Sequence, residues 1–176
     1  GVGSLVKAAI EKYGSQITGT KVHVDSVSLS LSTGEGTISG LTIANPEGFS
    51  AHNALEMKSI SIRIDTNSLM ANGPITIQSV TIEAPHVAFE GQGVDNNLQV
   101  IERHARSASR HDEVVQENGG TKQERKLIIS DLDIREGQLS VSHAQLGGGK
   151  AFAVPLSEIH LKNIGKAEDG ATPAET

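Results

Sequence analysis

The residue types in this chain that could do chemistry are histidines, paired aspartates and a glycine-rich loop. The seven histidines are His23, His52, His86, His104, His111, His143 and His160, and none of them pair at the spacing of metal ligands on a helix. Most of them alternate with aliphatic residues, so we expect them to face solvent. The histidines therefore predict no metal site, and no cofactor is expected.

Two other patterns resemble binding sites but lack part of the residue set. Asp131 and Asp133 lie on the polar side of a predicted strand and could bind a cation, although an exposed strand face is the simpler interpretation. Residues 147–150, Gly-Gly-Gly-Lys, resemble a phosphate loop, but Ala151 stands where Ser or Thr is needed. This segment predicts a hairpin loop. With no nucleophile elbow and no catalytic acid pair, we expect no enzymatic activity.

A cluster of basic residues gives the chain candidate contacts for anionic lipid headgroups. The cluster contains Arg103, Arg106 and Arg110, together with His104 and His111. Basic residues close to an anionic membrane surface gain about 1 kcal/mol each. The alternative is an ordinary solvated helix face, and the acidic residues Asp112 and Glu113 that follow at once weaken the positive patch.

The composition narrows the class of protein. A chain of 176 residues predicts one domain, and an aromatic content of 2% provides few rings for stacking bases or sugars. The net charge of -6 and the pI of about 5.6 exclude nucleic acid as the expected partner. With 0 Cys there are no disulfides or thiolate sites. No apolar run approaches the roughly 18 residues of a membrane-spanning helix. Because the chain begins at Gly1 and not at Met, we expect a processed or truncated product, so the lack of an anchor in this chain does not exclude one in the gene.

The histidines, aspartates and arginines named above must be positioned by the secondary structure, and one aliphatic spacing that recurs along the chain predicts that most of it is strand. Two aliphatic residues separated by one position are followed, after a gap of two residues, by two more. The copies are Val22, Val24, Val27, Leu29; Leu55, Met57, Ile60, Ile62; Ile75, Ile77, Val80, Ile82; Leu127, Ile129, Leu132, Ile134; and Val154, Leu156, Ile159, Leu161. Alternation with period two predicts strands with one aliphatic face.

The two-residue gap within each copy predicts curvature. One extra residue would send the second aliphatic pair to the opposite face unless a β-bulge absorbs it. The gaps are Asp25-Ser26, Lys58-Ser59, Gln78-Ser79, Ser130-Asp131 and Ser157-Glu158. Repeated bulges bend a whole sheet, so the fold class expected is mainly β (α+β): a strongly curved antiparallel sheet of bulged strands forming a groove with a concave aliphatic face.

Two short amphipathic helices accompany the expected sheet. Ser4 is a candidate N-cap for a helix that Gly14 ends, and Asn96 or Asn97 could cap the second helix. Strands are predicted near residues 21–31, 37–44, 55–65, 74–83, 126–135, 138–144 and 151–162, with a kink or strand end at Pro85 and a turn at Glu136-Gly137. We expect one domain over residues 1–164, with a mobile loop at about 109–125 and a disordered tail over 165–176.

The order of motifs over roughly residues 1–108 resembles the AsmA-like proteins of Gram-negative envelopes, whose N-terminal region is related to the chorein domain of bridge-like lipid transfer proteins. The motifs are the first helix followed by Ile17-Thr18-Gly19; the segment Gly40-Leu41-Thr42-Ile43-Ala44-Asn45-Pro46-Glu47-Gly48-Phe49; Ala54-Leu55-Glu56-Met57; the run from Ile75 to Ile82; Pro85-His86-Val87; and Asn97-Leu98. The resemblance implies an aliphatic groove, a tether to the inner membrane outside this chain, a periplasmic location and a role in lipid transport or envelope maintenance. The family brings no catalytic residues. Its members are commonly longer than this chain, which supplies only a short groove.

The residues expected to contact a lipid or fatty acyl chain are Val24, Leu29, Ile43, Ile60, Ile62, Ile77, Ile82 and Phe89. The expected partners are this lipid, a membrane surface and an envelope protein. The alternative is a non-enzymatic structural or adaptor module, in which the same aliphatic face is a closed core and a sheet edge or loop engages a protein partner.

Overall fold

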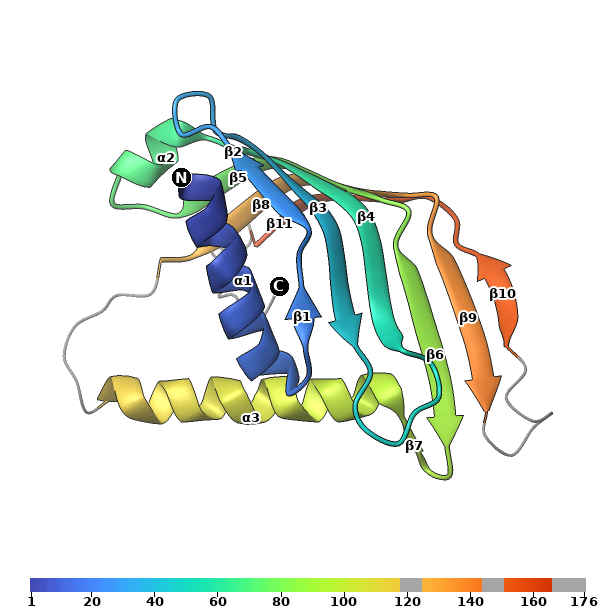
Figure 1. The fold of residues 1–176 in the computed structure, drawn as a ribbon. Helices are drawn as coiled ribbons and strands as arrows, with labels where there is room; N and C mark the ends of the chain where they lie inside the picture. Colours follow the sequence, from blue (N-terminus) through green and yellow to red (C-terminus); the bar gives the residue numbers. More distant parts are fainter. Residues whose placement is uncertain (118–124, 144–150, 166–176) are drawn as a thin grey trace.

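The structure is a computed structural model that describes residues 1–117, 125–143 and 151–165, without the side chains of residues 109–117. The helices are α1 (Val2–Thr18), α2 (Thr66–Met70) and α3 (Asn97–Glu117). The strands are β1 (Val22–His23), β2 (Ser26–Leu29), β3 (Glu35–Ala44), β4 (Asn53–Ile64), β5 (Ile75–Glu83), β6 (His86–Gln92), β7 (Asp95–Asn96), β8 (Leu127–Arg135), β9 (Gln138–His143), β10 (Phe152–Pro155) and β11 (Ile159–Ile164). The mainly-β expectation is confirmed: the strands form one sheet that curls into an open half-barrel (Figure 1).

Several of these strands are consecutive pieces of one longer strand. β1 and β2 share one register against β3, and β5 and β6 share one register against the adjoining parts of β4. β8 and β9 continue one register beside β5 and β6, and β11 and β10 do so against β8 and β9. Ten of the strands therefore form six rungs, which we number in chain order: β1–β2, β3, β4, β5–β6, β8–β9 and β10–β11. The remaining strand, β7, pairs with the end of β6.

Rungs 4 and 5 are parallel, which corrects the expectation of an antiparallel sheet at this junction. Ile82 lies opposite Ile134, and Phe89 lies opposite Val141, with both chains running the same way. The other neighbouring rungs are antiparallel. Parallel neighbours need a long crossover connection, and α3 lies in the segment between rungs 4 and 5. Aliphatic alternation is the same for both strand directions, so the sequence pattern does not reveal the direction.

All six rungs bend at one level, which we call the crease. The register on either side places Asp25, Gly40, Lys58, Ala84, Glu136 and Ser157 opposite one another, one residue from each rung. Three of them have left-handed φ angles: 65° at Gly40, 48° at Ala84 and 54° at Glu136. The aliphatic alternation shifts by one residue at this line in each rung, so the aliphatic side chains keep to one face through the bend.

The crease explains three of the five predicted gaps, and a second line explains the other two. Gln78, Ser130 and Asn163 lie opposite one another in rungs 4 to 6, and the register between β4 and β5 shifts there, between Arg63 and Ile64. The bulge expected at Gln78-Ser79 is therefore confirmed. At the crease the register between neighbouring rungs is the same on both sides. The gaps at Asp25-Ser26, Lys58-Ser59 and Ser157-Glu158 are therefore not bulges of single strands but bends that all rungs share. The Glu136-Gly137 step is also part of the crease, not a chain-reversing turn.

The helices are longer than expected. α1 passes through Gly14 and ends at Gly19, whose φ is 71° and whose N–H donates to the Ser15 carbonyl at 3.0 Å. Gly14 serves close packing, since a Cβ there would lie 3.2 Å from both γ-methyl carbons of Val22. The N-cap is Gly1, not Ser4. Asn96 Oδ1 accepts from the N–H of Gln99 at the start of α3.

Residues 109–117 belong to α3, which corrects the loop expected from residue 109. This stretch contains no glycine or proline, so no strong helix-breaking residue interrupts it before Gly119. The rest of the expected loop, apart from Arg125, lies outside the described residues, at 118–124. The same holds for residues 166–176 of the expected tail.

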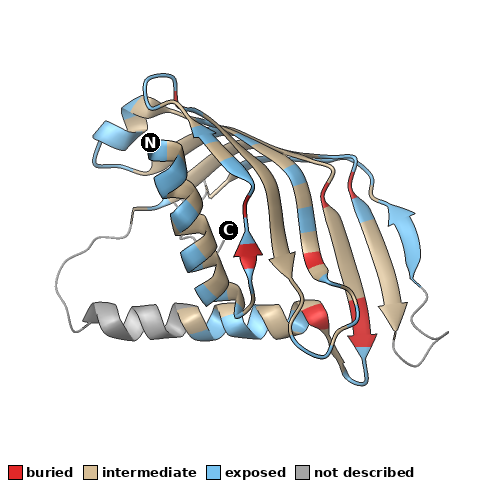
Figure 2. Ribbon diagram, viewed as in Figure 1, coloured by how far each residue is buried: buried red, intermediate tan, exposed pale blue. Residues whose placement is uncertain are grey.

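Few side chains in the described part of the chain are fully buried. The buried hydrophobic residues there are Val22, Val24 and Ala54, and the buried polar residues are Glu90 and Asn97. Figure 2 shows most of the sheet in the intermediate class of burial. A closed core would contain many fully buried aliphatic residues. The aliphatic face of this sheet is therefore only partly covered.

The conformation of Gly40 at the crease predicts that replacing it by alanine lowers the free energy of unfolding more than the same replacement at Gly73. Gly40→Ala should lower the free energy of unfolding by about 1–3 kcal/mol, because a left-handed φ is strained for residues with a Cβ. The new Cβ would also lie 2.0 Å from Asp25 Oδ2. Gly73→Ala is the matched control, since its Cβ would meet nothing within 4 Å, and it should change stability by less than about 0.5 kcal/mol. Urea unfolding measures both, and equal values would contradict the role given to the crease.

Candidate functional site

The candidate site is the inner face of the half-barrel, where aliphatic residues from different rungs stand side by side. Residues opposite one another in register share a face of the sheet. Three of the resulting rows are Val27, Ile38, Ile60, Ile82, Ile134, Ile159; Leu29, Gly36, Ile62, Val80, Leu132, Leu161; and Val22, Ile43, Leu55, Val87, Leu139, Val154. Each row crosses all six rungs without a charged residue.

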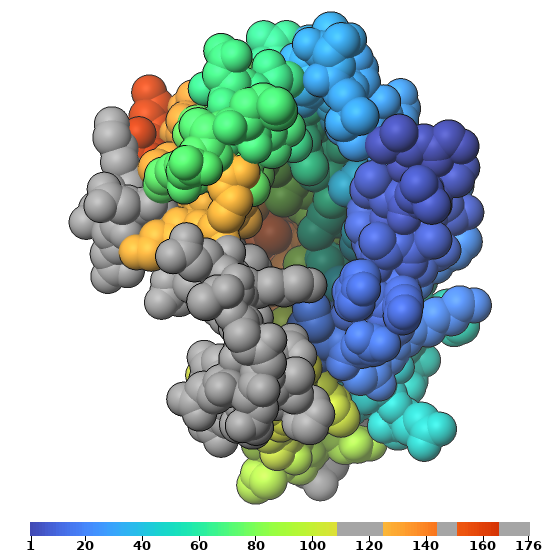
Figure 3. All heavy atoms as spheres, turned by 90° about the vertical axis from the view of Figure 1, so that its left-hand side faces the viewer, coloured from blue at the N-terminus to red at the C-terminus, as the bar shows by residue number. Residues whose placement is uncertain are grey.

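Shorter rows extend the inner face toward both ends of the rungs. Ile64, Ile77, Ile129 and Ile164 form one of them, and Phe89, Val141 and Phe152 form the other. In the space-filling view of Figure 3, a hollow opens between α1 and β8, below α2, and atoms of the inner strands are visible inside it. The inner face thus lines a trough that opens between α1 and β8 (Figure 3).

Seven of the eight predicted lipid contacts are half-buried on this face. They are Leu29, Ile43, Ile60, Ile62, Ile77, Ile82 and Phe89. At the last rung the inner residues are more exposed, with 38% of Ile159 and 47% of Leu161 accessible. Accessible aliphatic surface that is continuous across a sheet is the surface expected of an apolar binding site.

Val24 differs from the other predicted contacts because it is completely buried, at 0% exposure. Its backbone N–H donates to Glu11 Oε2 of α1 at 3.1 Å, and the N–H of Val22 donates to Ser15 Oγ at 3.0 Å. Helix α1 therefore lies along rung 1 and closes that edge. Val24 belongs to this packed contact and is not available to a ligand in the trough.

The outer face of the sheet is polar, and its histidines have partners. His160 contacts both Asp133 and Asp131 on the neighbouring rung, with 3.5 Å between His160 Nε2 and Asp131 Oδ1. His86 hydrogen-bonds Ser140 Oγ at 2.6 Å, and His23 contacts Glu11. The described residues contain no group of three or more ligating side chains placed to hold a metal ion. The two aspartates are thus partners of a histidine, a contact that the sequence pattern did not predict.

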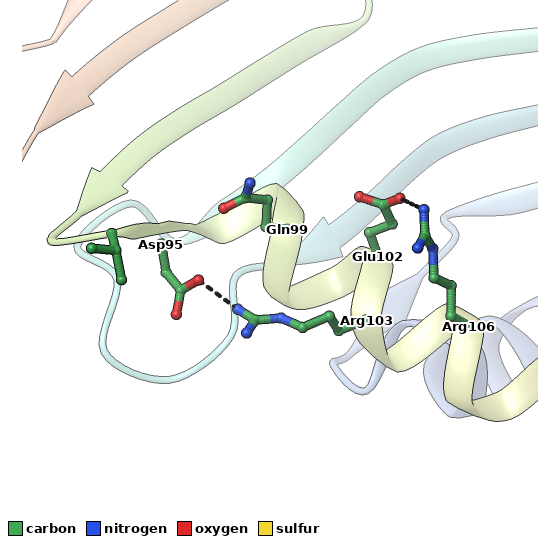
Figure 4. A pocket seen from close by; sticks show the side chains of 6 residues that line it. Asp95, Gln99, Glu102, Arg103 and Arg106 are labelled. Carbon is green, nitrogen blue, oxygen red and sulfur yellow. Dashed lines mark hydrogen bonds and ion pairs between the residues drawn. The ribbon is translucent and has the colours of Figure 1, made fainter.

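Two of the three arginines expected to contact headgroups, Arg103 and Arg106, line a surface cleft of about 300 Å³ at the start of α3 (Figure 4). Arg103 is paired with Asp95 at 2.8 Å, and Arg106 is paired with Glu102 at 2.7 Å. Val94, at the tip of the turn before β7, is 99% exposed beside them. The side chain of Arg110 and the Gly-Gly-Gly-Lys segment at 147–150 lie outside the described residues.

A buried polar network, which sequence reasoning missed, fixes the loop after β3. Asn97 Nδ2 donates to Asn45 Oδ1 at 2.7 Å and to the Ala88 carbonyl, while Asn97 Oδ1 accepts from the N–H of Glu90 at 2.9 Å. Asn97 is 0% exposed. The Asn45-Pro46 segment and the Asn96-Asn97 pair were the available sequence signals, but nothing in the sequence shows that the two segments meet.

Glu90 completes this network and is only 4% exposed. Burial raises the pKa of its carboxyl group, but hydrogen bonds outweigh this effect and hold the pKa below its ordinary value. The donors are Ser50 Oγ at 2.6 Å and the backbone N–H groups of Ser50 and Ala51. The network has no reactive pair, so its role is to order the loop against the start of α3.

Comparison of the chain with protein-family models and with curated proteins gives no match. The resemblance to AsmA-like proteins therefore remains a prediction. Within the ranges 1–117, 125–143 and 151–165, no helix is both long and apolar enough to cross a membrane.

The lowered pKa of Glu90 predicts a loss of stability in acid. A group whose pKa is lower in the folded state stabilises the fold above its unfolded pKa, about 4.3, and this contribution disappears as the pH falls through the folded value. Glu90→Gln should lower the free energy of unfolding at pH 7 by about 1–3 kcal/mol. The difference from the wild type should shrink toward pH 3.

Urea unfolding between pH 3 and pH 7 measures this difference. Glu47→Gln is the matched control, because Glu47 is exposed in the same loop. It should follow the wild type at every pH. A constant difference between Glu90→Gln and the wild type across the whole pH range would refute the electrostatic role of Glu90.

Proposed function

We propose that this chain is a lipid-binding domain that holds the acyl part of a lipid against the inner face of its half-barrel. The observation that carries the proposal is the set of aliphatic rows that cross all six rungs, half-buried in rungs 2 to 5 and exposed in rung 6. A surface of this kind offers dispersion contact and exclusion of water but no directional bonds. A flexible hydrocarbon chain is the ligand that needs only these properties.

The free energy expected from apolar contact is enough to bind an acyl chain. Each methylene that leaves water contributes about 0.8 kcal/mol, so about ten methylenes contribute about 8 kcal/mol before the costs of binding. A gross term of this size corresponds to a micromolar dissociation constant at best. The trough is open, so part of the chain stays in contact with water. We therefore expect reversible binding, which suits the transport or exchange of lipids more than permanent storage.

The setting proposed for this binding is the bacterial periplasm, close to the inner membrane, with a role in lipid transport or envelope maintenance. It rests on the resemblance of residues 1–108 to AsmA-like proteins. Arg103 and Arg106 are proposed headgroup contacts. Both pair with carboxylates at the surface, and such exposed pairs contribute only about 0–1 kcal/mol, so a lipid phosphate could replace the carboxylate at little cost.

The proposal predicts that a charge on the inner face abolishes binding without unfolding the domain. Ile62→Asp should raise the dissociation constant of a fluorescent fatty acid by at least about ten-fold, which corresponds to 1.4 kcal/mol. Ile77→Asp should do the same. Both positions are half-buried, so the carboxylate keeps contact with water and the thermal midpoint should fall only slightly. Fluorescence titration and circular dichroism measure the two quantities.

Ser61→Asp is the matched control, because Ser61 neighbours Ile62 but is exposed on the outer face. It should bind the probe as the wild type does. If Ile62→Asp and Ile77→Asp unfold the domain, the inner face is a closed core and the adaptor alternative applies. If the wild-type protein shows no saturable uptake of the fluorescent fatty acid, the proposal is wrong.

A further inference from the structure

The two outer edges of the sheet differ in whether another element covers them. The edge of rung 1 is occupied by α1, whose side chains Ser15 and Glu11 accept from the N–H groups of Val22 and Val24. At the opposite edge, no strand among the described residues pairs with the outer side of rung 6. Unpaired backbone at a sheet edge is a template for pairing with another strand. Among the described residues, the edge of rung 6 is therefore open and the edge of rung 1 is covered.

Within rung 6, the two strands differ in their ability to pair. The N–H of Leu156 donates to the Gly137 carbonyl at 2.8 Å, so by alternation the nitrogen of Pro155 faces the open edge. Proline there offers no donor, which protects β10. Strand β11 contains no proline, and its inner residues Ile159 and Leu161 are 38% and 47% exposed because no further rung covers them. The segment suited to pairing is therefore β11.

Charges on the outer face alternate from rung to rung and end at this edge. One row begins with the ion pair of Glu35 and Arg63, at 2.5 Å, and continues through Ser79 and Asp131 to Lys162. A second row begins with the ion pair of Glu83 and Arg135, at 3.7 Å. Its last residue, Glu158, precedes Ile159, which pairs with Ile134, so Glu158 lies opposite Arg135. A strand that continues both rows needs an acid beside Lys162 and a base beside Glu158.

We propose that a second copy of this chain supplies that strand, with β11 pairing antiparallel to the partner's β11 about a twofold axis at His160. This register places Glu158 opposite the partner's Lys162, and the twofold axis repeats the contact. It also places Ile159 opposite the partner's Leu161 on the inner face. A register centred one residue later, on Leu161, would instead place His160 opposite the partner's Lys162 and leave Glu158 without a base.

The pairing has two structural consequences. Antiparallel strands related by a twofold axis keep their inner faces on the same side, so the aliphatic rows of the two copies become continuous. In the described part of the chain, α1 occupies the edge of rung 1, so association through rung 6 stops at the dimer and forms no filament. Strand β11 has 6 residues, so the interface is small and the dimer is weak and concentration-dependent.

Charge reversal tests the proposed register. Lys162→Glu leaves two acid-to-acid contacts in the dimer, and Glu158→Lys leaves two base-to-base contacts. Sedimentation equilibrium up to about 500 µM should show a dimer for the wild type and a dissociation constant at least about ten-fold higher for each variant alone. An equimolar mixture of the two variants should dimerise again, since both contacts then join opposite charges. The double variant Glu158→Lys with Lys162→Glu should dimerise like the wild type.

Lys58→Glu is the matched control, because Lys58 is exposed in rung 3, away from the open edge. It should leave the dimer unchanged. Circular dichroism verifies that each variant is folded, which is expected because Glu158 and Lys162 are exposed. A wild type that stays monomeric over the whole concentration range overturns the proposal. A dimer that neither single reversal weakens also overturns it. The test contains no lipid, so its result is independent of the proposed binding of acyl chains.

Discussion

Side chains of a β-strand alternate between two faces, so a strand that bends sharply must shift this alternation or lose its apolar face. In this sheet all six rungs make the shift at one crease, with left-handed residues at Gly40, Ala84 and Glu136. Hydrogen bonding continues across the bend, as from the N–H of Ala84 to the Arg135 carbonyl and from the N–H of Gln138 to the Pro85 carbonyl. The shared crease therefore turns a ladder of strands into a trough while the aliphatic residues stay inside. The continuous rows of the inner face depend on it.

The helices and the loop after β3 pack around this trough and link its rungs. Helix α1 covers Val22 and Val24 at rung 1, and α3 links the parallel rungs 4 and 5. The buried pair Asn97 and Glu90 joins the start of α3 to the loop after β3, and each polar atom of this network has a partner. Polar burial thus fixes the loop and helix positions, while the aliphatic surface stays accessible. A domain that used the same residues as a closed core would show the opposite distribution.

The sequence was informative about strands and about the apolar face, because alternation is a local property that each rung repeats. The bends at Lys58 and Ser157 were also visible as gaps in the spacing. Their common alignment was not, because it depends on which strands are neighbours. The parallel junction between rungs 4 and 5 leaves alternation unchanged, and the burial of Val24 depends on where α1 packs. His160 is exposed, as expected, and the neighbouring rung brings two aspartates to it, which alternation along one strand does not reveal.

The most direct test of the account is the position of a bound acyl chain, measured by NMR of methyl-labelled protein during titration with a fatty acid. The account predicts saturable shifts for the methyl groups of Ile60, Ile62, Ile77 and Ile82, which line the trough. The methyl groups of Val24 should stay unchanged, because α1 covers this residue. Shifts confined to residues outside the inner face, or no saturable shifts at any isoleucine, would contradict the claim that this open aliphatic trough binds lipid.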